Sequence, residues 1–215
     1  MIKKLMVALT LASAMGVSQA AVLLQEDFDN VASLPAQGWV FENASQPPGI
    51  APGWVQGNPA VFDAHQGAPD AYIASSFESA APGGRLDDRL FTPLFSLENG
   101  AIATFWLRGA ADAGFSDIVV YGYTDGPADP GRFIQQMAIT APTDDWTMFT
   151  LTIAPQAGVM ARLGFVHTGE EATSNYVGLD TLRIEDMPRG AVPEPGSLAI
   201  LGLGLAGLAM ARRRS

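Results

Sequence analysis

Short β-forming runs separated by turn residues fill the chain between its two ends, and no long stretch has a helical period. The runs are rich in Val, Ile, Thr, Tyr and Phe, which strands favour, while Gly, Pro, Asn and Asp gather between them. They lie at residues 22–28, 71–77, 89–97, 101–108, 117–124, 133–139, 146–153, 161–167 and 176–184, and the Pro/Gly-rich residues 34–60 are expected to form a loop. This pattern predicts an all-β fold, a jelly-roll β-sandwich over residues 21–185.

Two pairings follow from the pattern. Asn99-Gly100 lies between two apolar runs, which is the strongest short-range signal for a β-hairpin. Residues 89–97 and 101–108 are therefore expected to pair through a tight turn. In a jelly roll the terminal strands are commonly neighbours, so 22–28 is expected beside 176–184.

Residues 1–20 have the three parts of a secretory signal peptide. Lys3 and Lys4 supply the positive start, residues 5–17 form a short apolar run, and Ser18-Gln19-Ala20 is a small-x-small cleavage site. The run is too short for a stable membrane span. We expect signal peptidase to cut after Ala20. The alternative is a buried N-terminal helix.

The C-terminal end also has an apolar run and a cluster of positive charge, in the opposite order. Pro193-Glu194-Pro195 closes a linker over residues 186–195, and a tail follows over residues 196–215. In that tail, residues 198–211 are wholly apolar and Arg212, Arg213 and Arg214 follow them. A helix over the apolar residues would be about 21 Å long against a hydrocarbon core of about 30 Å, a marginal span. The arginines favour the cytoplasmic side, which leaves the main domain outside. The alternative is a helix packed on the domain, but the segment is apolar all round.

Pro193-Glu194-Pro195, the apolar helix and the arginine cluster resemble the PEP-CTERM sorting signal. That resemblance implies a Gram-negative, exopolysaccharide-producing bacterium and processing by an exosortase near the Pro-Glu-Pro motif. It also implies that the C-terminal helix holds the protein in the inner membrane transiently, before the protein reaches the cell surface or the extracellular matrix.

The amino-acid composition limits the classes of ligand that the main domain can bind. Without the five cations of the two signals, seven arginines stand against 22 acidic residues, a net charge of −15, and no lysine remains. Such a surface repels nucleic acid and anionic polysaccharide, and it is compatible with divalent cations or neutral glycans. The absence of cysteine excludes disulfides, thiol nucleophiles and cysteine-based zinc sites.

A second resemblance rests on the order of seven short motifs across residues 22–185. They are Glu26-Asp27-Phe28-Asp29, Pro35-Ala36-Gln37-Gly38-Trp39, Ala74-Ser75-Ser76-Phe77, Leu90-Phe91-Thr92-Pro93, Phe105-Trp106-Leu107-Arg108, Ser116-Asp117-Ile118-Val119-Val120-Tyr121 and Leu179-Asp180-Thr181-Leu182. In that order they resemble the choice-of-anchor J or cleaved-adhesin domain, which is similar to MAM-type jelly rolls. Such domains often carry Asp-Asp where this chain has Asp180-Thr181.

Acids at both ends of the strand order suggest a structural calcium ion. Glu26, Asp27 and Asp29 end the first run and Asp180 lies in the last, so neighbouring terminal strands would bring their carboxylates together. Calcium takes six to eight oxygens in irregular geometry. The alternative is a set of solvated strand-end acids. Asp87-Asp88, flanked by Arg85 and Arg89, is a further cluster that could bind a cation or a sugar hydroxyl, or be a solvated turn.

Aromatic residues in strands belong mostly to the core. Trp39 and Trp54 lie in the Pro/Gly-rich loop instead, so they are the candidates for contact with a ligand. The chain has no Gly-x-Ser-x-Gly, no His-Glu-x-x-His and no phosphate-binding glycine loop.

Three classes of function follow. We expect a non-catalytic surface or matrix protein, and not an enzyme. A carbohydrate-binding module is the alternative and would differ by an exposed aromatic platform or groove. A polysaccharide-active enzyme would need two facing carboxylates in a cleft.

Overall fold

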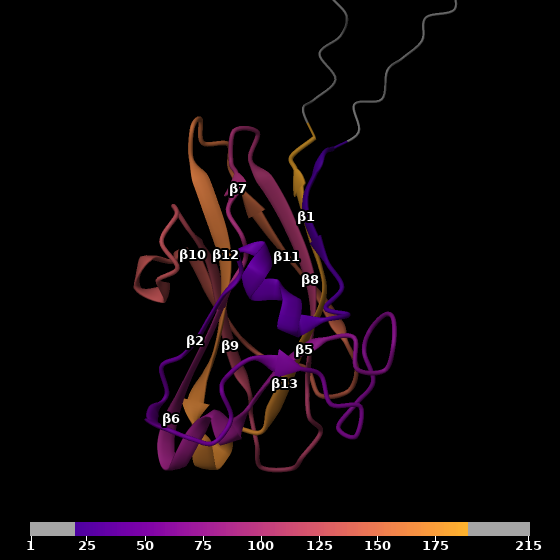
Figure 1. The fold of residues 1–215 in the computed structure, drawn as a ribbon, viewed down its shortest axis with the longest axis vertical. Coiled ribbons are helices and arrows are strands. Elements are labelled where there is room, and N and C mark those ends of the chain that lie inside the picture. The colour runs from indigo at the N-terminus through magenta and orange to yellow at the C-terminus, as the bar shows by residue number, and fades with distance from the viewer. Residues whose placement is uncertain (1–19, 189–215) are drawn as a thin grey trace, which may run out of the picture. The chain divides into compact units, whose positions relative to one another are not determined.

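A computed structural model describes residues 20–188, in which residues 21–187 form one compact unit. Two antiparallel sheets pack face to face in this unit, which confirms the all-β sandwich (Figure 1). The signal peptide, the Pro-Glu-Pro motif, the apolar helix and the arginine cluster lie outside the described residues. Within residues 20–188, no helix is long and apolar enough to cross a membrane.

The first sheet has six strands in the order β11–β8–β13–β5–β4, with β1 paired to β13. Its strands are β1 (Val22–Glu26), β4 (Val55–Gln56), β5 (Ile73–Ser76), β8 (Ala101–Gly109), β11 (Thr147–Ile153) and β13 (Tyr176–Asp186). The predicted neighbourhood of the terminal strands is confirmed, since Glu26 lies opposite Leu182 in the β1–β13 pair.

The second sheet has seven strands in the order β10–β9–β12–β6–β2, with β3 paired to β6 and β7 paired to β12. Its strands are β2 (Val40–Asn43), β3 (Gln46–Pro48), β6 (Ala80–Phe91), β7 (Phe95–Ser96), β9 (Ile118–Thr124), β10 (Ile134–Thr140) and β12 (Met160–Glu170). Four short 3₁₀ helices connect strands: η1 (Val31–Gln37), η2 (Phe77–Ser79), η3 (Pro130–Arg132) and η4 (Glu171–Thr173).

Alternate residues along the strands are buried, and their side chains form the core between the sheets. In β8 every second residue is buried, as expected for a strand with one face inward. Phe105 lies at the centre of this core, with its ring 5.0 Å from that of Tyr121 and 4.9 Å from that of Phe165. The indigo helix η1 crosses one side of the sandwich and adds Val31 and Leu34 to the core (Figure 1).

The hairpin predicted at Asn99-Gly100 is wrong. A turn does form there, because Gly100 donates its N–H to Leu97 O at 2.9 Å. However, β7 pairs with β12 in the second sheet, whereas β8 pairs with β11 and β13 in the first. The turn therefore carries the chain from one sheet to the other. Gly100 is needed at φ +74°, and a Cβ there would lie 2.7 Å from Ile153 O.

The loop predicted over residues 34–60 is also partly wrong. Val40–Asn43 forms β2 at the edge of the second sheet, pairing with β6, and β3 and β4 lie in the same region. The prolines around it were strong loop signals, but they flank a four-residue strand that β6 holds by pairing.

A buried polar chain links the two sheets. Ser75, on β5 of the first sheet, donates its hydroxyl to Asp88 Oδ2 on β6 at 2.5 Å, and its Oγ lies 2.9 Å from His167 Nδ1 on β12. His167 Nε2 lies 3.0 Å from Asp117 Oδ1. Asp117 also accepts the backbone N–H of Asn175 at 2.7 Å, at the start of β13. All four side chains are buried, so each polar group depends on the others.

We predict that Asp88→Ala destabilises the domain far more than Asp87→Ala. The first change leaves the buried hydroxyls of Ser45 and Ser75 without their acceptor, which costs about 3 kcal/mol. For a domain of this size, the melting temperature should fall by roughly 6–12 °C. Asp87 is on the same strand but faces outward, where ion pairs contribute about 1 kcal/mol or less. Equal losses in thermal unfolding would contradict a network that joins the sheets.

Candidate functional site

A groove of about 440 Å³ crosses the outer face of the second sheet. Its lining comes from β3, β6, β9, β10, β12 and the segment around η3: Ala44, Gln46, Arg85, Asp87, Val120, Pro130, Gly131, Phe133, Gln136, Val166 and Thr168. The size falls within the range of small-molecule sites, about 300–1,000 Å³. It is therefore large enough for one or two sugar rings.

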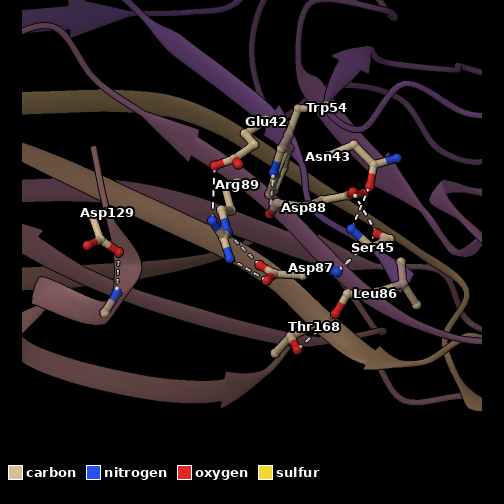
Figure 2. Close-up of polar contacts among 11 residues, drawn as sticks. Glu42, Asn43, Ser45, Trp54, Leu86, Asp87, Asp88, Arg89, Asp129 and Thr168 are labelled. Carbon is tan, nitrogen blue, oxygen red and sulfur yellow. Dashed lines mark hydrogen bonds and ion pairs between the residues drawn. The ribbon is translucent and has the colours of Figure 1, made fainter. Parts of the chain in front are cut away.

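The pleat of β6 determines which of its charged side chains reach this groove. Asp88 faces the core, whereas Asp87 and Arg89 face outward. Arg89 holds Asp87 with two hydrogen bonds, Nε to Oδ1 at 2.8 Å and NH2 to Oδ2 at 2.6 Å, and reaches Glu42 Oε2 at 3.0 Å (Figure 2). The bonds to Asp87 raise the pKa of Arg89. Asp87 is thus held in place at the rim of the groove.

The floor of the groove is apolar. The half-buried ring of Phe133 packs against that of Phe91 at 5.8 Å. It lies over two glycines in neighbouring strands. A Cβ on Gly164 would come within 2.6 Å of Phe133 Cε1, and one on Gly122 within 3.1 Å of Phe133 Cγ. Val120 and Val166 lie opposite each other and extend the apolar surface.

The rim carries polar groups that are available to a ligand. Gln46 and Gln136 are exposed, and in the part of the chain that the structure describes their side-chain amides have no hydrogen-bond partner. Arg85 pairs only loosely with Glu170, at 3.4 Å, with both side chains mostly exposed. Donors and acceptors above an apolar floor are the usual pattern of a neutral polar-ligand site.

A second hollow of about 410 Å³ lies at the β4–β5 edge of the first sheet. Four of its polar residues are already paired with one another. Asn58 N–H donates to Tyr176 Oη at 2.9 Å, and Asn175 Nδ2 donates to Asp112 Oδ2 at 2.5 Å. Because these groups satisfy one another, the groove on the second sheet is the better candidate for a ligand site.

The four acids predicted to bind calcium lie in different environments. Glu26 Oε1 accepts the N–H of Phe28 at 2.9 Å, and Asp27 Oδ2 accepts Gln25 Nε2 at 3.3 Å. Asp180 is fully buried and accepts backbone N–H groups from His65 at 2.8 Å, Gln66 at 3.1 Å and Thr181 at 2.5 Å.

Asp29, in the turn between β1 and η1, lies close to the loop that carries His65 and Gln66. Its Oδ1 is 3.4 Å from where a Cβ on Gly67 would be, one residue beyond Gln66. Even so, residues 20–188 contain no group of three or more acidic or histidine side chains that could hold a metal ion. As arranged, the carboxylates of Glu26 and Asp180 bind amides of the chain, and calcium binding stays a prediction.

Both tryptophans predicted to contact a ligand lie in the core. Trp39 is 3% exposed and packs edge-on against Phe28, and Trp54 is 5% exposed with its Nε1 donating to Asp88 O at 3.0 Å (Figure 2). Their loop is folded inward against the sandwich, so neither ring forms a platform for a ligand.

Most of the groove residues were not predicted from the sequence. The Arg85–Arg89 cluster was noted, but its division into inward and outward side chains becomes clear only with the register of β6. Phe133 and Gln136 gave no signal, because a Phe and a Gln in a strand-like run are unremarkable. Gly122 and Gly164 were the available clue, since glycine inside a strand indicates close approach of another group.

The comparisons with known proteins concern two different parts of the chain, the C-terminal tail and the β-sandwich domain. Residues 191–214 match the PEP-CTERM protein-sorting motif. The chain carries a PEP-CTERM sorting motif. This motif implies an exported protein that is sorted to the cell surface. No curated protein matches the chain.

The domain is similar in fold to adhesin domains of Lys-gingipain. The K3 cleaved adhesin domain from Porphyromonas gingivalis has a TM-score of 0.57 and 23% identity, covering 77% of this chain and 99% of its own. The K1 domain from the same organism has a TM-score of 0.56 and 23% identity, covering 78% and 98%. The K2 domain has a TM-score of 0.53 and 18% identity, covering 76% and 99%. At these identities the likeness shows the fold alone.

We predict that Asp180 makes stability fall as the pH rises. Burial raises the pKa of Asp180 to about 6, against an ordinary value of 3.8, with the three backbone donors lowering it. The folded state therefore holds a proton that the unfolded state has lost between these values. The free energy of unfolding should fall by about 3 kcal/mol as the pH rises from 4 through 6, and level off above.

The measurement compares denaturant unfolding of the natural protein and Asp180→Asn across this pH range. The difference in the free energy of unfolding between the natural protein and Asp180→Asn should change with pH, because the variant has no titrating group at position 180. Leu179→Ala is the matched control, since it destabilises the same strand without removing a titrating group. Parallel pH profiles for all three proteins would rule out this role of Asp180.

Proposed function

We propose that this protein is an exosortase-sorted surface or matrix protein whose sandwich is a non-catalytic interaction domain that binds a neutral polysaccharide. The PEP-CTERM motif at residues 191–214 carries the first part, since it implies export and sorting. Signal peptidase and exosortase are the proposed processing partners. The protein is held in the inner membrane until the exosortase acts.

The groove on the second sheet supports the binding part. Its apolar floor, formed by Phe133, Val120 and Val166, suits the C–H face of a sugar ring. The Gln46 and Gln136 amides, Arg85 and the fixed carboxylate of Asp87 suit hydroxyl groups. The strong negative charge of the mature domain repels acidic polymers, which favours a neutral glycan.

The burial of the Ser75–His167–Asp117 group supports a non-catalytic role. A hydroxyl, an imidazole and a carboxylate in series form the arrangement of a hydrolase triad. Here Ser75 and His167 are 0% exposed and Asp117 is 4% exposed, between the two sheets, so no substrate reaches the hydroxyl. The group is better explained as the polar link between the sheets.

We predict that the mature protein in its host lacks both terminal signals. Intact-mass measurement of the secreted protein should give a chain that begins at Ala21 and ends near the Pro-Glu-Pro motif. Replacing Arg212, Arg213 and Arg214 with alanine should leave part of the protein unprocessed. A secreted protein that still contains Arg214 would contradict exosortase sorting.

We predict that the groove binds a neutral glycan. The secreted protein should bind neutral members of a glycan array, and Arg85→Ala and Gln136→Ala should each weaken binding about tenfold, the loss of one ligand hydrogen bond. Arg183→Ala is the matched control, because it removes a partly exposed arginine from the first sheet. Binding that depends on Arg183 and not on Arg85 would place the site elsewhere.

A further inference from the structure

Three backbone carbonyls converge on one atom between β1 and β5. Gln56 Nε2, on β4, lies 2.8 Å from Phe28 O, 2.6 Å from Asp70 O and 3.4 Å from Tyr72 O. We call these three oxygens the carbonyl cradle. They come from two segments far apart in the sequence, the turn after β1 and the residues before β5.

The cradle has the character of a cation site. Carbonyl oxygens carry partial negative charge, so three of them aimed at one point repel each other unless a positive group lies between them. Oxygen-rich cradles of this kind are what calcium binds. Here an amide nitrogen occupies the centre, and its two hydrogens must serve three acceptors.

The orientation of the Gln56 amide is determined by its other end. Gln56 Oε1 accepts the backbone N–H of Val31 at 2.9 Å. If the amide were turned over, an NH₂ group would face an N–H donor and the oxygen would face three carbonyls. The nitrogen therefore lies in the cradle for a chemical reason.

The backbone of Phe28 has an unusual conformation that directs its carbonyl oxygen into the cradle. Phe28 has a φ of +54°, in the left-handed region that residues other than glycine rarely adopt. Its N–H is taken by Glu26 Oε1 at 2.9 Å while its C=O points to Gln56. Strain of this kind persists where surrounding contacts impose it, and it gathers at binding sites.

We propose that the side-chain amide of Gln56 takes the place of a bound cation, so that this domain ties β1 to the β4–β5 region without an ion in the carbonyl cradle. One side chain holds Phe28, Val31, Asp70 and Tyr72 together. A structural ion would be expected to hold segments together in this way in an acidic domain without disulfides. A carboxylate in place of the amide would turn the cradle into a calcium site.

The test compares the natural protein with Gln56→Glu and Gln37→Glu. Gln56→Glu places negative charge among the three carbonyls, so its melting temperature in EDTA should fall by roughly 6 °C or more. Calcium at a hundredfold excess over its Kd should raise that value again by roughly 5–10 °C, and magnesium should do less. The natural protein should gain less from calcium than Gln56→Glu does, because its amide nitrogen already occupies the cradle.

Gln37→Glu is the matched control for the added charge. Gln37 is exposed and makes a single side-chain bond, to Ser33 Oγ at 3.1 Å, so calcium should not affect the variant. Equilibrium dialysis with calcium alone supplies a second readout, with Gln56→Glu retaining one ion more than the natural protein.

Two results would overturn the proposal. A natural protein whose melting temperature rises with calcium as much as that of Gln56→Glu would show that the cradle itself takes an ion. A Gln56→Glu variant that calcium does not stabilise, or that folds neither with nor without calcium, would show that the cradle cannot take a cation.

Discussion

The two-sided pleat of β6 is the constraint on which the rest of the domain depends. Along this strand, Asp88 points between the sheets and joins the buried chain of Ser75, His167 and Asp117. Asp87 and Arg89, one residue to either side, point to the outer face, where Asp87 lines the groove and Arg89 holds it in place. A slip of one residue would expose the buried acid and bury an arginine, so packing and groove depend on the same register.

An exported domain without cysteine must hold itself together by other means. The hydrophobic core between the sheets, with Phe105 at its centre, supplies the non-directional stabilisation. Directional links are added where strands of different sheets or distant loops meet. The Asp88 network links the sheets, three backbone donors hold Asp180, and the Gln56 amide ties the first strand to the residues before β5. Each link satisfies buried polar groups that would otherwise oppose folding.

The strand composition was enough to predict the fold class, because strand runs and turns are local signals. The β1–β13 neighbourhood followed from the jelly-roll architecture. Pairing was harder: Asn99-Gly100 forms a turn, but which sheet each flanking strand joins depends on distant partners such as Met160 and Ala161. The groove was harder still, because exposure of Gln136 and Phe133 is a property of the assembled sheet. Trp39 and Trp54 show the converse, since a loop-like sequence folds inward over the core.

The placement of the chain ends within the domain bears on how the groove is presented. Asp186 N–H donates to Ala21 O at 2.8 Å, and both β1 and β13 belong to the first sheet. Residues 21 and 186 therefore lie side by side at the first sheet, which does not carry the groove. The outer face of the second sheet is formed without either residue. The proposed removal of residues 1–20 and of the tail after the Pro-Glu-Pro motif would take away none of the residues that line the groove.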